Sequence, residues 1–327
     1  MAWLTGWSYR KEITLNRASG AVTNYQMLLL VGESAGASGE NVDCNTHCQT
    51  DFDDLRFTAA DGTTLLDYWI ESLTGTTPNQ LATVWIEFDS IGTGATTFYM
   101  YYGKADAAAV SSGANTFIVF DDFERGIDGD TVGGSWTDVA GGVKISTDHA
   151  YGGTRCMKLV GAATTPSAAL LVATTNLIAV RCRVWKENLS GVNYLFLWEP
   201  VSGKASYTLV RTTEKINYYD TTYREVGTAA ADAWTLFENN NFNFTAYTFD
   251  MMYNGANIKT GAVMFNAGTG GGTGKLSFFT FDAAGDDSYI DDVIVRNWRA
   301  TEPAWGSWGS EEEAEPPSGV SFVAWID

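Results

Sequence analysis

The sequence predicts an all-β protein made of two β-sandwich domains. Aromatic residues make up 13% of the chain, glycine is frequent with 34 residues, and proline is sparse with six. Threonine is also abundant, and few stretches keep apolar residues at helical spacing for long. Aromatic and β-branched side chains favour strands. A chain of 327 residues exceeds the usual size of one domain, so we expect two domains.

The first domain is expected at residues 1–104, where short apolar runs alternate with turn residues such as the Asp61-Gly62 pair. The expected strands are 6–15, 25–31, 55–57, 65–71, 83–88 and 97–102. Six or so strands in about 100 residues are typical of a small β-sandwich. Residues 105–116 are rich in Ala, Ser and Gly and are expected to be a linker, in which 105–110 could form a helical turn.

The second domain is expected at residues 117–310. Its expected strands are 117–124, 142–146, 156–160, 168–173, 178–187, 194–199, 206–211, 215–220, 235–242, 245–253, 261–265, 276–282 and 288–296. So many strands exceed an immunoglobulin-like number and indicate a larger two-sheet jelly roll. Asn254-Gly255 fits a tight hairpin turn, because both residues tolerate a positive φ.

Residues 311–327 are expected to be a tail. Its first part is acidic and carries two prolines, which is typical of a linker, and its last eight residues are mostly apolar. The tail ends in Phe322, Trp325 and Ile326, which a solvated segment would seldom carry together. They either pack on their own chain or anchor the chain on a neighbouring subunit, for instance as an added strand.

The net charge limits the partners of the chain. The 39 acidic and 20 basic side chains give a net charge of −19, which repels phosphate backbones and anionic membrane surfaces. No run of about 18 apolar residues is present, and Met1–Gly6 has neither the basic start nor the apolar run of an export signal. We therefore expect no nucleic-acid partner and no membrane insertion. For export we expect either a precursor whose leader has been removed or a route without a leader, such as release by lysis inside a virus particle.

The four cysteines form a close pair, Cys44 and Cys48, and a distant pair, Cys156 and Cys182. An even number permits disulfides without proving them. Cys44 and Cys48 are expected to be a disulfide or free thiols, with a zinc site that includes His47 as the alternative, although a fourth ligand is not evident. Cys156 and Cys182 lie in strand-like runs, and they either pair across neighbouring strands or are small core residues.

Five segments in the first domain resemble the DUF2341 family. They are GWSYRKEITL at 6–15, DFDDLRFT at 51–58, DGTTLLDYWIE at 61–71, ATVWIE at 82–87 and FYMYYG at 98–103. The resemblance covers about 100 residues and implies a β-sandwich module found in surface proteins of bacteria and archaea and in tailed-phage proteins. Such modules are often followed by a concanavalin-like domain.

The second domain resembles the concanavalin A-like lectin/glucanase jelly rolls, which include laminin-G-like domains. The resemblance is carried by FDDF at 120–123, WTL at 234–236 with YTFDMMYNG at 247–255, and YIDDVIV at 289–295. These jelly rolls serve as lectins, hydrolases and structural domains, so the fold alone decides no function.

The sequence offers no catalytic constellation, so we expect a protein that is not an enzyme. A retaining glycosidase needs two carboxylates about 5 Å apart, and the nearest match to the glucanase pattern Glu-x-Asp-x-x-Glu, at Glu87 and Asp89, lacks the second Glu. The two histidines, His47 and His149, lie in no recognisable nucleophile motif. The glycine-rich run 268–277 differs from a phosphate loop at two essential positions and predicts a flexible hairpin.

The sequence indicates no certain cofactor, but two carboxylate clusters could hold a structural Ca²⁺. One opens the second domain and the other surrounds its last strand, and these two strands commonly lie side by side in this fold. The residues are Asp121, Asp122 and Glu124 in the first cluster and Asp286, Asp287, Asp291 and Asp292 in the second. Converging carboxylates repel one another, and Ca²⁺ with six to eight oxygen ligands relieves this. The alternative is that they are exposed turn residues or cap backbone amides.

Carbohydrate binding would use exposed aromatic side chains, because sugar rings pack on Trp or Tyr while polar neighbours bind the hydroxyls. The candidates are Trp198, Tyr218, Tyr219 and Tyr223, with Asn217 and Asp220 as polar partners. The alternative is that these rings are core or cross-strand packing residues.

Taken with the resemblances, these features favour a non-enzymatic virion protein of a tailed phage: a head decoration, fibre or tail-associated subunit. Its sandwich domains would face outward on the virion surface, contact other virion subunits and copies of itself, and bind host or environmental glycans. The alternatives are a secreted or cell-surface glycan-binding adhesin of a bacterium or archaeon, and a glycoside hydrolase with an atypical site.

Overall fold

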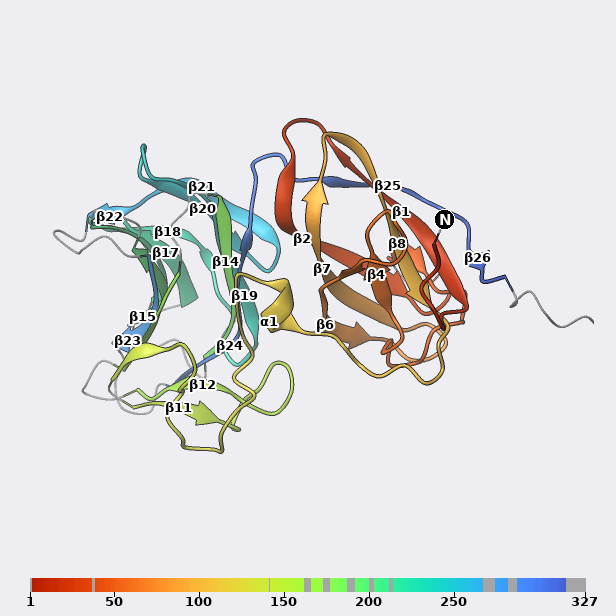
Figure 1. The fold of residues 1–327 in the computed structure, drawn as a ribbon. Helices are drawn as coiled ribbons and strands as arrows, with labels where there is room; N and C mark the ends of the chain where they lie inside the picture. The colour runs from red at the N-terminus through yellow and green to blue at the C-terminus, as the bar shows by residue number, and fades with distance from the viewer. Residues whose placement is uncertain are drawn as a thin grey trace, which may run out of the picture. The chain divides into compact units, whose positions relative to one another are not determined.

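The computed structural model consists of two compact β-sandwich units, each described here by itself (Figure 1). The first unit contains residues up to Thr116 together with the segment from Thr301 onward, and the second contains Phe117–Ala300. The structure describes residues 2–36, 39–140, 142–161, 166–172, 177–186, 192–199, 203–211, 214–266, 274–281 and 287–315. The predicted tail residues Phe322, Trp325 and Ile326, and Asp286 of the predicted calcium cluster, lie outside this part of the chain.

Two sheets form the first unit. One has the strand order β25-β1-β8-β4-β5, and the other has the order β3-β2-β7-β6. The bounds are β1 Tyr9–Arg17, β2 Val22–Gly32, β3 Val42–Asp43, β4 Arg56–Thr58, β5 Leu65–Leu66, β6 Tyr68–Thr74, β7 Leu81–Ile91 and β8 Gly94–Tyr102. Alternate side chains of these strands are buried in one core cluster, as Ile13 and Leu15 on β1 illustrate. The predicted small sandwich is thus observed.

The first unit is completed by a segment from the far end of the chain. Strands β25 (Ala304–Trp308) and β26 (Glu312–Glu313) both pair antiparallel with β1, and β25 runs beside β1 in Figure 1. Trp305 and Trp308 pack against the core, and the Trp305 indole donates to the Leu28 carbonyl of β2 at 3.0 Å. The structure therefore places residues 301–315 with the first unit, whereas the sequence analysis extended the second domain to residue 310. Backbone pairing and the burial of two indoles explain the difference.

Arg10 fixes β26 to the sheet. Its guanidinium is buried and donates to one carboxylate oxygen of Glu312 from Nε at 2.9 Å and from Nη2 at 2.7 Å. It also lies over the rings of Trp3 and Tyr99, with its central carbon 4.4 and 4.3 Å from the two ring centroids. Burial works against the charged form, but hydrogen bonds with Tyr101 and Glu312 outweigh it and raise the pKa of Arg10.

The second unit is a larger two-sheet sandwich. One sheet has the order β10-β13-β23-β15-β16-β17-β18 with β22 paired to β16, and the other has the order β11-β12-β24-β14-β19-β20-β21 with β9 paired to β24. In chain order the bounds are β9 Val119–Asp121, β10 Thr137–Ala140, β11 Val143–Ser146, β12 Cys156–Leu159, β13 Ser167–Leu171, β14 Ile178–Lys186, β15 Val192–Glu199, β16 Lys204–Arg211, β17 Lys215–Tyr219, β18 Tyr223–Thr228, β19 Thr235–Asn243, β20 Thr248–Tyr253, β21 Ala256–Val263, β22 Phe265–Asn266, β23 Lys275–Phe281 and β24 Ser288–Asn297. The core lies between the sheets and takes side chains from both, such as Val180 of β14 and Phe278 of β23.

Local signals in the sequence account for some details and miss others. Asn254 and Gly255 have φ values of 47° and 79° and form the tight turn between β20 and β21, as predicted. Residues 105 and 106 form a turn but no helix, and the helix α1 is Gly113–Thr116, where the Thr116 hydroxyl donates to the Ser112 carbonyl. No helix in the described residues is long and apolar enough to cross a membrane.

Candidate functional site

One sheet of the second unit turns a group of aromatic rings away from the core. Tyr218 of β17 belongs to the core cluster, and because side chains alternate along a strand, Tyr219 faces the other side of the sheet. Thr208 of β16 pairs with Tyr218, so Tyr207 lies on the same outward side as Tyr219. The hairpin to β18 adds Tyr223, which pairs with Tyr219.

These rings, with Phe265 of β22, form what we call the outer aromatic face: Tyr207, Tyr219, Tyr223 and Phe265. The Tyr219 centroid lies 4.9 Å from that of Phe265 and 4.9 Å from that of Tyr223. Tyr207 lies edge-on to Phe265 at 5.3 Å and to Tyr219 at 6.0 Å. Tyr223 is 38% exposed and the others are half-buried, so part of this contiguous ring surface is exposed to solvent.

Two of the predicted carbohydrate-binding residues lie on the outer aromatic face, and three others are buried or shape a turn. Tyr219 and Tyr223 lie on this face. Tyr218 points into the core, and Asn217 is buried and donates to the Lys215 carbonyl at 2.9 Å. Asp220 shapes the hairpin, and a hydrogen bond from the Thr222 N–H is the largest cause that lowers the pKa of its carboxyl to about 2.

One predicted residue, Trp198, and two residues that were not predicted, Tyr207 and Phe265, lie on the same sheet or beside it. Trp198 belongs to β15 of the same sheet, but its side chain lies outside the described part of the structure. Tyr207 and Phe265 were not predicted. Alternation from Tyr219 could have suggested a partner on the neighbouring strand, but the register that selects Tyr207 is set by the fold.

A second group of rings lies on the other sheet of the second unit and holds a loop in place. The His149 ring stacks on Trp185 with centroids 4.5 Å apart, and Trp185 and Trp234 are 6.1 Å apart. The same loop is held through its backbone, because the Asp291 carboxylate accepts the Tyr151 N–H at 2.8 Å. This group therefore holds the loop that carries His149 and Tyr151.

The carboxylates predicted to bind Ca²⁺ interact with protein groups instead. Asp121 forms an ion pair with Arg125 at 2.6 Å and accepts the Trp136 indole N–H at 2.6 Å. Glu124 accepts the backbone N–H groups of Thr154 and Arg155, each at 2.6 Å.

The remaining members of the two clusters behave similarly. Asp122 accepts the Glu124 N–H at 3.2 Å, and Asp292 is buried. Asp287 forms an ion pair with Lys158 at 2.9 Å. Within the described ranges no group of three or more His, Cys, Asp or Glu residues could hold a metal ion. The expected convergence is not observed there, because neighbouring donors already satisfy these side chains.

Asp291 has the most perturbed carboxyl of this region. It is fully buried on β24, and burial, followed by the nearby charge of Asp292, raises its pKa to about 8. A raised pKa is a feature of general acids. Asp291 has no exposed surface, however, so a substrate cannot reach it in this structure.

All four cysteines are free thiols in the structure. Cys156 and Cys182 are buried in the second unit, on β12 and β14, and burial raises the pKa of each thiol. Cys44 is buried and hydrogen-bonded to Cys48, which is half-buried. The choice among a disulfide, free thiols and a zinc site with His47 stays a prediction.

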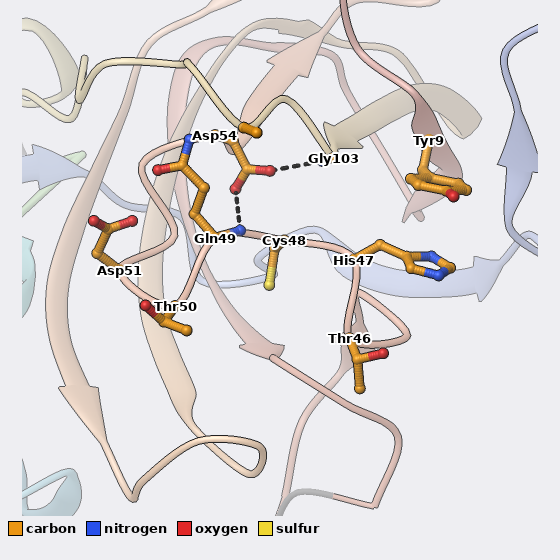
Figure 2. Close-up of a pocket in the computed structure, with 10 residues that line it drawn as sticks. Tyr9, Thr46, His47, Cys48, Gln49, Thr50, Asp51, Asp54 and Gly103 are labelled. Carbon is orange, nitrogen blue, oxygen red and sulfur yellow. Dashed lines mark hydrogen bonds between the residues drawn. The ribbon is translucent and has the colours of Figure 1, made fainter.

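The first unit contains a polar pocket of about 590 Å³ (Figure 2). Tyr9 and His47 stack at its mouth, with ring centroids 4.0 Å apart and planes inclined by 13°. His47 Nδ1 lies 3.1 Å from a carboxylate oxygen of Glu311, and the buried Tyr102 hydroxyl donates to Glu311 at 2.7 Å. Glu311, which directly precedes β26, therefore lies beside this pocket.

The pocket loop is held by Asp54. Its fully buried carboxylate accepts the Gln49 N–H at 3.0 Å and the N–H groups of Gly103 and Lys104 at 2.6 and 3.2 Å; the first two bonds are the dashed lines in Figure 2. Gln49 in turn donates its side-chain amide to the Lys104 carbonyl at 2.8 Å. Asp54 and Gln49 therefore shape the wall of the pocket and are already hydrogen-bonded.

Glu87, on β7 of the first unit, is half-buried. Burial, followed by the charges of Asp67 and Asp89, raises its pKa to about 7. Glu87 and Asp89 are the residues nearest to a glucanase pattern in the sequence, and they lie in the unit that does not contain the outer aromatic face.

A family model matches part of the chain. Residues 51–139 match the model of DUF2341, a domain of unknown function. The match includes four of the five segments that carry the resemblance. It also extends past Thr116 into the second unit, which begins at Phe117. No curated protein matches the chain.

Solved structures with a similar arrangement include several carbohydrate-related proteins. One is described as a cellulose-induced protein, Cip1, with 17% identity, a TM-score of 0.40, and coverage of 54% of this chain and 96% of that one. Another is a carbohydrate esterase of the Shiga toxin-encoding bacteriophage phi24B, with 14% identity, a TM-score of 0.41 and coverage of 50% and 91%. A third comes from work on endo-acting O-glycanases of the human gut microbiota, with 10% identity, a TM-score of 0.42 and coverage of 56% and 100%.

Proposed function

We propose that the protein is a non-catalytic glycan-binding protein and that the outer aromatic face of the second unit is its binding site. The observation that carries the proposal is the contiguous set of rings Tyr207, Tyr219, Tyr223 and Phe265 on the side of the sheet away from the core. The apolar faces of sugar rings pack on aromatic rings, and the phenolic hydroxyls and nearby polar groups bind sugar hydroxyls.

The non-catalytic part of the proposal is supported by the partners of the acidic residues. Glycoside hydrolysis needs two reachable carboxylates on either side of the scissile bond. In the second unit Asp121 forms an ion pair, Glu124 accepts backbone N–H groups, and Asp291 is fully buried. Absence of product release from polysaccharides that the protein binds would support this part, and turnover lost on a single carboxylate substitution would overturn it.

The setting that we propose is the surface of a tailed-phage particle, where the protein would contact other virion subunits and copies of itself. The family resemblance of the first unit and the high net negative charge, which favours solubility at high copy number, support it. Mass spectrometry of purified particles would test the setting. An adhesin on a bacterial or archaeal surface remains the alternative, and its test is surface labelling of intact cells.

Glycan binding is tested with a glycan array followed by calorimetric titration of the best ligand. Loss of one stacked ring costs about 1 kcal/mol, so we expect Tyr219→Ala and Tyr223→Ala each to weaken binding about five-fold. Tyr151→Ala, which removes an exposed ring from the loop between β11 and β12, is the matched control and should bind like the unmodified protein. Equal losses in all three variants, or no binding to any glycan, would contradict the proposal.

A further inference from the structure

An arginine stacks on the exposed end of the outer aromatic face. Arg211, the last residue of β16, places its central guanidinium carbon 3.7 Å from the centroid of the Tyr223 ring. Contact of this kind fixes the plane of the guanidinium and leaves its edges free to form hydrogen bonds. Arg211 is therefore held in a defined orientation beside the rings.

Unlike the neighbouring cations, Arg211 forms no ion pair with a carboxylate in the described residues. Lys215 lies 2.7 Å from a carboxylate oxygen of Glu225, and Arg224 lies 3.0 Å from one of Asp220. Arg211 forms no ion pair with any carboxylate in the described residues, although the chain carries 39 acidic side chains. Its Nε is also buried without a hydrogen-bond partner there.

We infer that the outer aromatic face binds an acidic polysaccharide and that Arg211 binds the carboxylate of a uronic acid residue. This inference rests on the proposed glycan-binding function and names its ligand class. A planar guanidinium matches a planar carboxylate with two parallel hydrogen bonds, which a neutral sugar hydroxyl cannot reproduce. The uronate ring would pack on Tyr219, beside the Tyr223 ring that Arg211 covers, while its carboxylate reaches Arg211.

The first test compares ligands on the unmodified full-length chain. Oligogalacturonate is titrated beside its methyl-esterified form, which has the same rings without the charge, at one fixed ionic strength near 0.15 M because charge interactions are screened by salt. We expect the esterified form to bind at least ten-fold more weakly. Equal binding of the two forms would overturn the inference. A sulfated polysaccharide that binds where oligogalacturonate does not would overturn the choice of a carboxylate.

The second test compares variants. Arg211→Gln should weaken oligogalacturonate binding about ten-fold or more and leave a neutral oligosaccharide unchanged, and Arg211→Lys, which keeps the charge without the fork, should be intermediate. Arg224→Gln is the matched control, because Asp220 already neutralises that charge, and it should change binding less than two-fold. An unchanged affinity in Arg211→Gln would overturn the inference.

Failure of the acidic-ligand inference can be distinguished from failure of the proposed glycan-binding function. If Tyr219→Ala weakens binding of a neutral glycan as expected and Arg211→Gln leaves oligogalacturonate binding unchanged, the glycan-binding function stands and the acidic ligand is wrong. If no glycan binds, both fail. Thermal unfolding of each variant identifies a loss caused by misfolding, and in that case the comparison of esterified and free ligand on the unmodified chain decides.

Discussion

Replacing Asp54 with alanine should strongly destabilise the first unit. The buried Asp54 carboxylate accepts three backbone N–H groups, from Gln49, Gly103 and Lys104, and so ties the pocket loop to the end of β8. A hydrogen bond to a charged group contributes about 1.5–3 kcal/mol, and unpaired buried donors add a penalty. Because the bond to Lys104 is long, we expect a total loss of about 3–5 kcal/mol in the free energy of unfolding of this unit.

The assay is urea unfolding of the full chain, followed by calorimetry to resolve the transitions of the two units. Asp54→Asn retains one acceptor oxygen, so its loss in the free energy of unfolding should be about half that of Asp54→Ala. Asp51→Asn changes an exposed carboxylate of the same loop and should cost no more than about 0.5 kcal/mol. A loss below about 1 kcal/mol for Asp54→Ala, or equal losses for Asp54→Ala and Asp51→Asn, would refute the reasoning.

Three further predictions concern other parts of the chain. Asp291→Asn should flatten the pH dependence of stability: a pKa raised to about 8 in the folded state means that the stability from this carboxyl is present below about pH 4 and is lost as the pH rises through about 8. Melting temperatures across that range check this, and Asp106→Asn, which changes an exposed carboxyl, should leave the dependence as it is. Glu312→Gln should lower the free energy of unfolding by about 1 kcal/mol or less, because Glu312 is 43% exposed. Arg10→Ala should lower it by about 2–3 kcal/mol, because the packing of the guanidinium on the aromatic rings is lost. Urea midpoints in the reverse order would be inconsistent with the structure. A thiol reagent should modify Cys48 first in the folded protein and all four cysteines after unfolding without reductant, and fewer than four would reveal a disulfide.

The fold class and most strands were predictable because they rest on local signals. Alternating burial along β1 and β7, and the φ values of Asn254 and Gly255, follow from short-range sequence patterns. The pairing of β25 with β1 was not predictable, since it joins Leu15 to Trp305 across most of the chain. Non-local pairing of this kind leaves no periodic signature in the sequence.

The candidate site was predictable only in part. A run of polar and aromatic residues at 217–220 indicated a ligand-binding strand, but it could not reveal that Tyr218 faces the core and Tyr219 faces outward. A one-residue shift in register exchanges the two faces of a strand. Likewise, the density of Asp residues indicated Ca²⁺, whereas the partners that satisfy Asp121 and Glu124, such as Arg125 and the Thr154 N–H, became evident only in the structure.

Hydrogen–deuterium exchange with and without oligogalacturonate tests the central claim most directly, because it locates the bound ligand on the chain. The ligand should slow amide exchange in β16, β17 and β18, residues 204–228, and leave the pocket loop at 44–54 of the first unit unchanged. Slowed exchange confined to the pocket loop or to 145–152, or no change at a saturating ligand concentration, would contradict glycan binding at the outer aromatic face.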